Sequence, residues 1–314
     1  MATLRAIKDR ITSIKNTQKI TRAMKMVAAA KVKKAENQTK ASRPFASELY
    51  KIISALLADF EGEFKPIEGA RPIENYPELL KDREIDTAGL VVISSNKGLA
   101  GAYSSNIVRY TIKRIKEENA LGRKVKLFLV GQKAIAPLKS AQKNLDFEIV
   151  DVYTKLLDGI SATKGLILAE DVVRAYIDGA IDTIELITTR YKNMMTYKVE
   201  SWDILPLTGE DSKLKKFREE DKEHEKKLHA LMQFEPNVET ILKKLMPMYF
   251  TNIIYQALLE ALASELASRM TAMSAAVNNA SDMIQTLTID YNKARQAKIT
   301  QELTEIISGV NAIK

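Results

Sequence analysis

The sequence has no cysteine among its 314 residues. Disulfides, thiolate metal sites and thiol switches are therefore excluded together, and the absence fits a reducing compartment. Only two histidines are present, His224 and His229. On a helix, a step of five residues turns the second side chain by about 140° from the first, so this pair is not placed to hold one metal ion.

Chemistry-bearing clusters are equally scarce. No nucleophile stands next to a base, and the carboxylates that flank His224, Glu223 and Glu225, belong to a run of charges of both signs. We therefore predict no catalytic residue, no metal site and no bound cofactor.

Aromatic residues make up only 6% of the chain, and no apolar run approaches the roughly 18 residues that a membrane span needs. The first residues show neither a signal-peptide core nor a Ser-rich transit segment. We expect a soluble protein that packs helix on helix.

Long helices with an apolar stripe are predicted at both ends of the chain, the first over about residues 3–57 and the second from just after Pro236 or Pro247 almost to the end. The stripe of the last helix recurs at steps of three or four, the coiled-coil period: Leu262, Leu266, Met270, Met273, Val277, Ala280, Ile284, Leu287, Tyr291 and Ala294. The stripe of the first helix comprises Leu4, Ile7, Ile11, Ile14, Ile20, Met24 and Val27, with Thr17 bridging the longest step. Because the two helices lie at opposite ends of one chain, they are predicted to pair antiparallel.

Between them, short β-branched runs alternate with amphipathic helices, a pattern typical of an α/β domain. Strands are expected at 89–94, 125–130, 146–150, 183–191 and 196–204, the last two as an antiparallel hairpin. The predicted fold is thus a long antiparallel coiled coil plus a small doubly wound, Rossmann-like domain. Its segments are 1–59 (N-terminal helix), 60–87 (irregular connector), 88–208 (α/β domain), 209–236 (charged excursion) and 237–314 (C-terminal helix).

The loop from Ser95 to Asn106 follows the first predicted strand, where a doubly wound sheet would bind a ligand. Only two residues separate Gly98 from Gly101, whereas a phosphate loop needs about four and a following Gly-Lys-Ser/Thr, and a dinucleotide fingerprint needs about three glycines. We expect a tight turn, with Ser104 or Ser105 capping the next helix.

Positive charge concentrates in the first helix. Residues 1–51 hold thirteen Lys or Arg against Asp9, Glu36 and Glu48, out of a net charge of +8 for the chain. Such a helix could bind nucleic acid, an anionic membrane or an acidic protein surface, or its charged face could simply be solvated. Without further information, two other classes stay open: a basic coiled-coil protein that binds nucleic acid, and a nucleotide-dependent enzyme built on the α/β domain.

The stripe of the last helix slips after Ala294 and resumes at Leu303, with Arg295 and Gln296 beside the slip. A planar cation there favours a contact outside the helix pair, although an ordinary exposed arginine fits as well. Beyond it, the apolar residues Ile306, Ile307, Val310 and Ile313 outrun any partner in the first helix. We expect an apolar surface of another molecule, a collar, to surround them.

Both ends of the chain carry long, specific motifs. They are IKDRITSIKNTQKITRAMKMVAAAK at residues 7–31 and YNKARQAKITQELTEIISG at residues 291–309, the latter preceded by RMTAM at 269–273. With them, the sequence resembles, from end to end, the central-shaft (gamma) subunit of the rotary F-type ATP synthase. Two features depart from that family: Ser95 and Asn96 replace an acidic residue usual in the central turn, and the segment 209–230 is longer and more charged than in the plain bacterial pattern.

The resemblance implies a non-catalytic rotor shaft that transmits torque between a membrane rotor ring driven by ions and a hexamer of alpha and beta subunits. It implies no direct small-molecule substrate and no nucleic acid. By the resemblance, the residues that contact the catalytic subunits are Met24, Lys25, Arg295, Gln296, Thr300 and Glu305. The apolar tip (Ile306, Ile307, Val310 and Ile313) would turn inside a hydrophobic collar formed by the hexamer. The α/β domain would sit at the foot with an epsilon subunit, and Leu231, Met232, Phe234 and Glu235 would meet the c-ring. The implied location is peripheral, on the cytoplasmic face of a bacterial plasma membrane.

Overall fold

A computed structural model describes residues 4–58, 67, 69–81, 83–207 and 238–313. The chain divides into two compact units. The first, which we call the terminal unit, consists of residues 1–30 and 269–314, and the second, the sheet unit, consists of residues 31–268. Each terminal helix contributes to both.

The two terminal helices are α1 (Leu4–Ala58) and α8 (Val238–Ile313), 55 and 76 residues long. Helix α1 contains no glycine, and α8 has only Gly309, close to its end, so little of either helix carries the backbone entropy penalty of that residue. Each continues through one proline, Pro44 in α1 and Pro247 in α8. The prediction of a long helix at each end is confirmed, with α8 beginning after Pro236.

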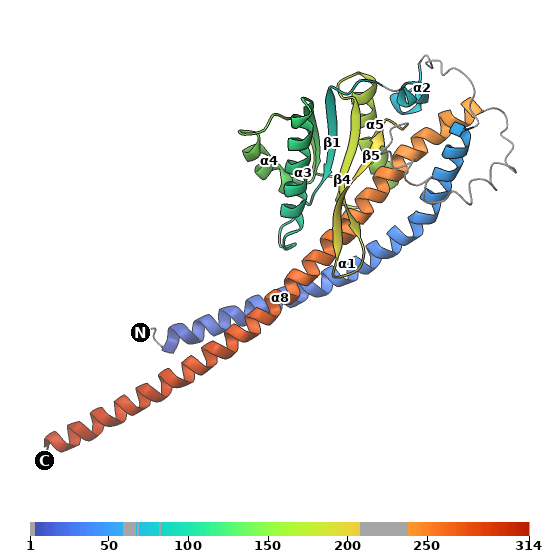
Figure 1. The fold of residues 1–314 in the computed structure, drawn as a ribbon. Helices are drawn as coiled ribbons and strands as arrows, with labels where there is room; N and C mark the ends of the chain where they lie inside the picture. Colours follow the sequence, from blue (N-terminus) through green and yellow to red (C-terminus); the bar gives the residue numbers. More distant parts are fainter. Residues whose placement is uncertain (1–3, 59–66, 68, 82, 208–237, 314) are drawn as a thin grey trace. The chain divides into compact units, whose positions relative to one another are not determined.

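A five-stranded sheet forms the centre of the sheet unit (Figure 1). Its strands are β1 (Thr87–Ile93), β2 (Lys124–Val130), β3 (Glu148–Tyr153), β4 (Thr183–Tyr191) and β5 (Tyr197–Leu205). They lie in the order β3-β2-β1-β4-β5, with β1 parallel to β2 and β4, β2 parallel to β3, and β5 antiparallel to β4 at the edge. The predicted parallel sheet with an antiparallel edge hairpin is confirmed.

Alternate residues of β1 enter two separate cores. Leu90 and Val92 pack with α3 (Tyr103–Ala120), the short helix η2 (Gln132–Ala134) and α4 (Ile135–Ala141). Val91 and Ile93 pack with α5 (Ala162–Ile177) and with the parts of α1 and α8 that belong to this unit. Figure 1 shows α3 and α4 on one side of β1 and α5 on the other. The period of two along a strand accounts for this division of side chains.

Helix α5 approaches α8 closely at Gly165. A Cβ atom at this position would lie 3.1 Å from the Thr251 carbonyl oxygen and 3.3 Å from the Tyr255 Cβ. A glycine therefore sets how near the two helices come.

Three local expectations are corrected. Part of the connector is helical, since η1 (Pro72–Glu74) and α2 (Tyr76–Leu80) bury Ile73 and Tyr76 in the core with α5. The third strand lies at Glu148–Tyr153, not at 146–150, because its pairing with β2 starts at Glu148 opposite Lys126. No side chain caps α3: Ala102 is the N-cap residue, and the Ser104 hydroxyl pairs with that of Ser95 at 2.7 Å.

Candidate functional site: the helix pair and its attachments

The contact seam of α1 in the terminal unit is a strict heptad stripe. Its residues are half-buried or buried at steps of three and four: Leu4, Ile7, Ile11, Ile14, Gln18, Thr21, Lys25 and Ala28. The facing stripe of α8 runs through the predicted residues from Met270 to Ala294. This regular spacing is the signature of knobs-into-holes packing.

Polar side chains link the two stripes and set their direction. Gln18 Nε2 donates to Ser281 Oγ at 2.6 Å and to the Val277 carbonyl at 3.4 Å, and Lys25 Nζ donates to Ser274 Oγ at 3.0 Å. From Gln18 to Lys25 the chain advances seven residues, while their partners step back seven, from Ser281 to Ser274. The helices are therefore antiparallel, as predicted.

The predicted seam of α1 is wrong after Ile14. Ile20 and Val27 are 63% and 56% exposed, and Met24 is half-buried beside the seam. The contact stripe passes through Gln18, Thr21 and Lys25, because a heptad seam holds its spacing even where the residues at those positions are polar. Ile20, Val27 and Met26 are thus exposed apolar side chains outside the contact stripe of α1.

The end of α8 has no such partner among the described residues. Every residue from Arg295 to Gly309 is exposed, including Gln296, Thr300 and Glu305. The polar bonds there are local to the helix: Thr300 Oγ1 donates to the Gln296 carbonyl at 3.0 Å, and Gln301 Nε2 donates to Glu305 at 2.9 Å. Of the four predicted contact residues in α8, none pairs with α1.

Apolar residues of this helix end face solvent. Ile306 and Ile307 are 63% and 60% exposed, and Ile299 and Leu303 are about half exposed. Val310 and Ile313 belong to α8, but their side chains lie outside the described part of the chain, as do the predicted foot residues Leu231, Met232, Phe234 and Glu235.

In the sheet unit, an ion pair with a buried carboxylate ties three elements together. Arg43 of α1 donates from Nη2 to Glu260 Oε1 of α8 at 2.7 Å, and the Tyr191 backbone N–H of β4 donates to Glu260 Oε2 at 2.7 Å. The Glu260 side chain is fully buried, whereas Arg43 is 41% exposed. A carboxylate out of water is tolerated only when such donors satisfy it.

Further hydrogen bonds attach the same face of α8 to the sheet and its loops. Thr188 Oγ1 donates to the Ala257 carbonyl at 3.2 Å, and the Tyr103 hydroxyl donates to the Ala261 carbonyl at 3.1 Å. Burial raises the pKa of Tyr103, so its hydroxyl keeps the proton that it donates. About two turns further along α8, Ser268 Oγ donates to the Ala100 carbonyl at 2.7 Å.

Sequence reasoning missed these attachment residues. Arg43, Glu260 and Tyr103 stand far apart in the sequence, and nothing in the local pattern marks them. The spacing alone predicts Gln18 and Lys25, because they continue the row of Leu4 and Ile11 in steps of seven.

The loop after β1 directs its polar side chains into contacts within the protein. Leu99 adopts a positive φ of 63° and is 62% exposed, and Ser95 turns its hydroxyl toward Ser104 and the Lys97 carbonyl. Across the ranges that the structure describes, no group of three or more His, Cys, Asp or Glu side chains is arranged to hold a metal ion. The described helices include none long and apolar enough to cross a membrane.

Comparison with known proteins relates this architecture to one family. A family model described as ATP synthase matches residues 3–313. The ATP synthase gamma chain of Picosynechococcus sp. is 39% identical over 328 residues, and the alignment covers 100% of both proteins.

Two solved structures have a similar fold. A chain of the central stalk and c-ring of the Tetrahymena thermophila mitochondrial ATP synthase is 25% identical, with a TM-score of 0.54 over 82% of this chain and 99% of that one. A chain from the Euglena gracilis mitochondrial ATP synthase has a TM-score of 0.63 at 17% identity, over 99% of this chain and 94% of that one. The alternative of a coiled coil that binds nucleic acid finds no support among these relatives. Given a family model that spans the chain and a full-length relative of this identity, the chain belongs to the ATP synthase family, among its gamma chains.

Proposed function

We propose that this chain is the central rotor shaft of an ATP synthase, turning inside the catalytic hexamer and coupling ion flow to ATP synthesis or hydrolysis. The observation that carries the proposal is the antiparallel helix pair whose α8 end continues, exposed and partly apolar, past the last residue of its seam. Exposed Ile306 and Ile307 would be unfavourable in water for a protein that acts alone. They are expected of a shaft whose end is surrounded by apolar residues of other subunits.

The shaft contacts three different catalytic subunits with three different faces, so each subunit is held in a different state. A contact can shift such an equilibrium only by its difference in affinity for the states. The proposed contact residues are Met24, Lys25, Arg295, Gln296, Thr300 and Glu305. Exposure supports the four in α8, and the exposed Ile20, Met26 and Val27 extend the contact surface on α1 beside Met24. Lys25 is the weakest member, because its ammonium already binds Ser274.

Torque must also pass between the sheet unit and its helices. The Arg43–Glu260–Tyr191 link and the bonds to Ala257 and Ala261 join the sheet to α1 and α8 by both packing and directional hydrogen bonds. We infer that this unit is the foot of the shaft, held by an epsilon subunit and the c-ring, with Leu231, Met232, Phe234 and Glu235 as the proposed ring-facing segment. The two cores on opposite faces of β1 support a doubly wound domain.

In this proposal the chain performs no chemistry itself. The alpha and beta subunits hold the nucleotides, and the shaft binds no cofactor. Its place is peripheral, at the cytoplasmic face of a bacterial plasma membrane, within the membrane-bound complex.

Copurification and native mass measurement test the assignment. We expect one copy of this chain per six larger subunits, no ATPase activity from the purified chain, and hydrolysis coupled to rotation when the chain is added to its hexamer. Another stoichiometry, or full rotation-coupled hydrolysis by a complex that lacks this chain, would refute the shaft role.

A further inference from the structure

Strand β4 of the sheet unit is joined to helices on both of its faces. On one face, the Glu185 carboxylate accepts hydrogen bonds from Arg114 of α3, with the shortest at 2.8 Å. On the other, Thr188 Oγ1 donates to the Ala257 carbonyl of α8 at 3.2 Å. Successive side chains of a strand point to opposite faces, so residues three apart serve different helices. Strand β4 is therefore the element at which α3 and α8 are connected through the sheet.

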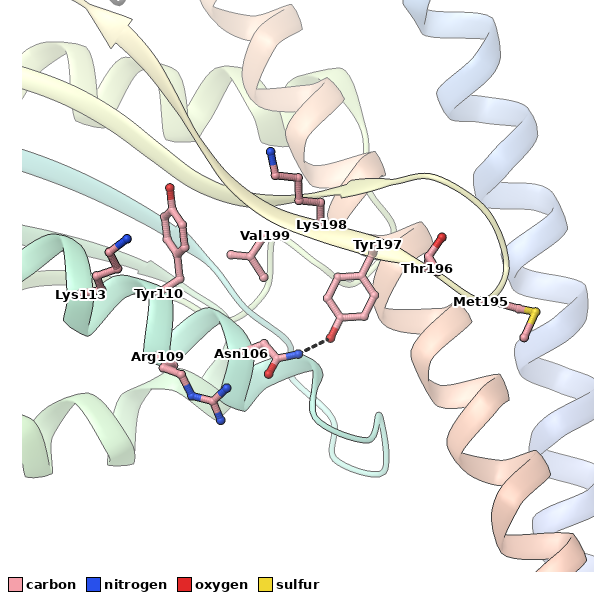
Figure 2. Close-up of a pocket in the computed structure, with 9 residues that line it drawn as sticks. All are labelled: Asn106, Arg109, Tyr110, Lys113, Met195, Thr196, Tyr197, Lys198 and Val199. Carbon is pink, nitrogen blue, oxygen red and sulfur yellow. Dashed lines mark hydrogen bonds between the residues drawn. The ribbon is translucent and has the colours of Figure 1, made fainter.

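Helix α3 has a second attachment at the sheet edge. Asn106 Nδ2 of α3 donates to the Tyr197 hydroxyl of β5 at 2.9 Å, as Figure 2 shows. This bond lies in the first turn of α3, and the pair of Arg114 with Glu185 lies about two turns further on. Helix α3 is thus held to the sheet at two separate points.

Two of the bonds to α8 lie on one line along that helix. Thr188 donates to the Ala257 carbonyl, and the Tyr103 hydroxyl donates to the Ala261 carbonyl. Residues four apart stand almost above one another on a helix. Contacts along a single line oppose sliding of the helix but oppose its rolling about that line only weakly.

Apolar packing at the same place adds little resistance to rolling. Ala257 and Ala261 are buried in the core of the sheet unit with Leu186 of β4. Hydrophobic association is non-directional, and a methyl side chain presents no long group that would catch on its neighbours. A contact away from the line of Ala257 and Ala261 is needed to set the angle of α8.

Glu260 supplies that contact. By helix geometry it lies about 60° round α8 from Ala257 and about 100° from Ala261. Its two carboxylate oxygens are divided between two elements, since Oε2 accepts from the Tyr191 backbone N–H of β4 and Oε1 accepts from Nη2 of Arg43 of α1, each at 2.7 Å. One planar group therefore holds α8 against a strand and against a second helix.

Burial makes this connection costly to break. The Glu260 side chain is fully buried, so water does not readily replace a lost donor. Lys40 of α1 differs: it is 64% exposed, and its ion pair with Glu36 stays within α1. Arg43 and Lys40 carry the same charge on the same helix, but the pair of Arg43 crosses to α8.

We infer that Arg43 is a positioning residue for torque: by holding Glu260 it fixes the rotational setting of α1 and α8 against β4, so that turning of these helices reaches the sheet without slack. The inference rests on the proposed shaft function and names the contact through which that function acts in the sheet unit. The alternative is that Arg43 only stabilises the fold. In that case a variant that regains stability should regain stiffness as well.

Distances between two spin labels test the inference in the free chain. Because the sequence has no cysteine, labels attach only at introduced ones, here Q38C on α1 and K198C on β5, both at exposed positions. The double variant R43M/E260M leaves no buried ion, yet it should widen the distance distribution ~1.5-fold or more. K40M removes a charge from the same helix and should leave the width unchanged. An unchanged width in R43M/E260M would overturn the inference.

Rotation of the assembled complex tests the same variants under load, with the hexamer fixed to a surface and a bead attached at K198C. We expect the angular variance of the bead at each pause to rise ~2-fold or more in R43M/E260M, even where urea unfolding shows recovered stability. E260Q keeps the size of the side chain but not its charge; it should also raise the variance, and it replaces the double variant if that one does not assemble. R43K keeps a cation beside Glu260 and should lie closer to the unsubstituted chain than E260Q does.

The bead experiment separates this inference from the shaft function. If the bead rotates and its variance in R43M/E260M and E260Q equals that of the unsubstituted chain, Arg43 only stabilises the fold, and the shaft function stands. If the bead does not rotate even with the unsubstituted chain, the shaft function fails. The spin-label widths then decide by themselves whether Arg43 sets the angle of the helices.

Discussion

Helix α8 behaves as two different helices in the two units of the molecule. In the sheet unit Leu258 and Leu259 are completely buried, whereas in the terminal unit Leu303 is 54% and Ile306 63% exposed. The residue types are the same, so composition does not decide burial. What differs is the packing: in the sheet unit α8 packs in a core with α1, α5 and the sheet, while every residue of its far end from Arg295 to Gly309 is exposed.

The polar contacts differ in the same way. Those of the sheet unit include the carboxylate of Glu260, which is fully buried, while the polar seam residues of the terminal unit, Gln18 and Lys25, are half-buried. Buried charge fixes a geometry strongly because breaking it leaves an unpaired ion, whereas half-buried polar contacts are easily replaced by water. This contrast fits the proposed shaft, in which the sheet unit keeps its geometry and the helix end is completed by other subunits.

The largest contrast is expected from one substitution made at two places. Leu258→Ala opens a cavity in the core of the sheet unit and should lower the free energy of unfolding by about 3 kcal/mol. Leu303→Ala removes the same atoms from an exposed site and should change it by less than about 0.5 kcal/mol. Urea unfolding of the purified chains measures both.

In the assembled complex, Leu303→Ala should have a clear effect although it has almost none in the free chain. There, Leu303→Ala should reduce coupling of hydrolysis to rotation, because the proposed collar loses apolar contact. A large loss of stability for Leu303→Ala in the free chain would show that this helix end already has a partner within the protein, and would break the comparison.

The next contrast concerns charge. Arg43→Met leaves the Glu260 carboxylate buried with only the Tyr191 N–H as donor, and should lower the free energy of unfolding by about 2 kcal/mol. Adding Glu260→Met should recover part of that loss, since no buried ion then remains. The matched control is Lys298→Met, which breaks an exposed pair with Glu302 in the terminal unit and should leave the urea midpoint unchanged. Similar losses for Arg43→Met and the control would contradict a structural role for the buried pair.

Much of the fold followed from periodicity. Heptad spacing over Leu262 to Ala294 predicted the α8 seam correctly, and short β-branched runs predicted the five strands. The predicted α1 seam is wrong at Ile20 and Val27, because the contact stripe keeps heptad spacing even at polar residues: Gln18 and Lys25 hold the seam positions. The Arg43–Glu260 pair was out of reach, since a contact between residues 217 positions apart in sequence depends on tertiary packing alone.

The smallest effect is expected at the polar seam. Lys25→Leu with Ser274→Ala replaces both partners of a half-buried hydrogen bond, one at a seam position of α1 and one beside the α8 stripe, by apolar groups. The change should stabilise the helix pair by about 1 kcal/mol. Lys19→Leu is the control, because Lys19 is exposed beside the seam and gains no contact. Hydrogen exchange of residues 18–28 should slow in the double variant only. If exchange speeds up instead, the Lys25–Ser274 bond holds the helices together more strongly than apolar packing could, and the terminal unit resembles the sheet unit in depending on specific polar contacts.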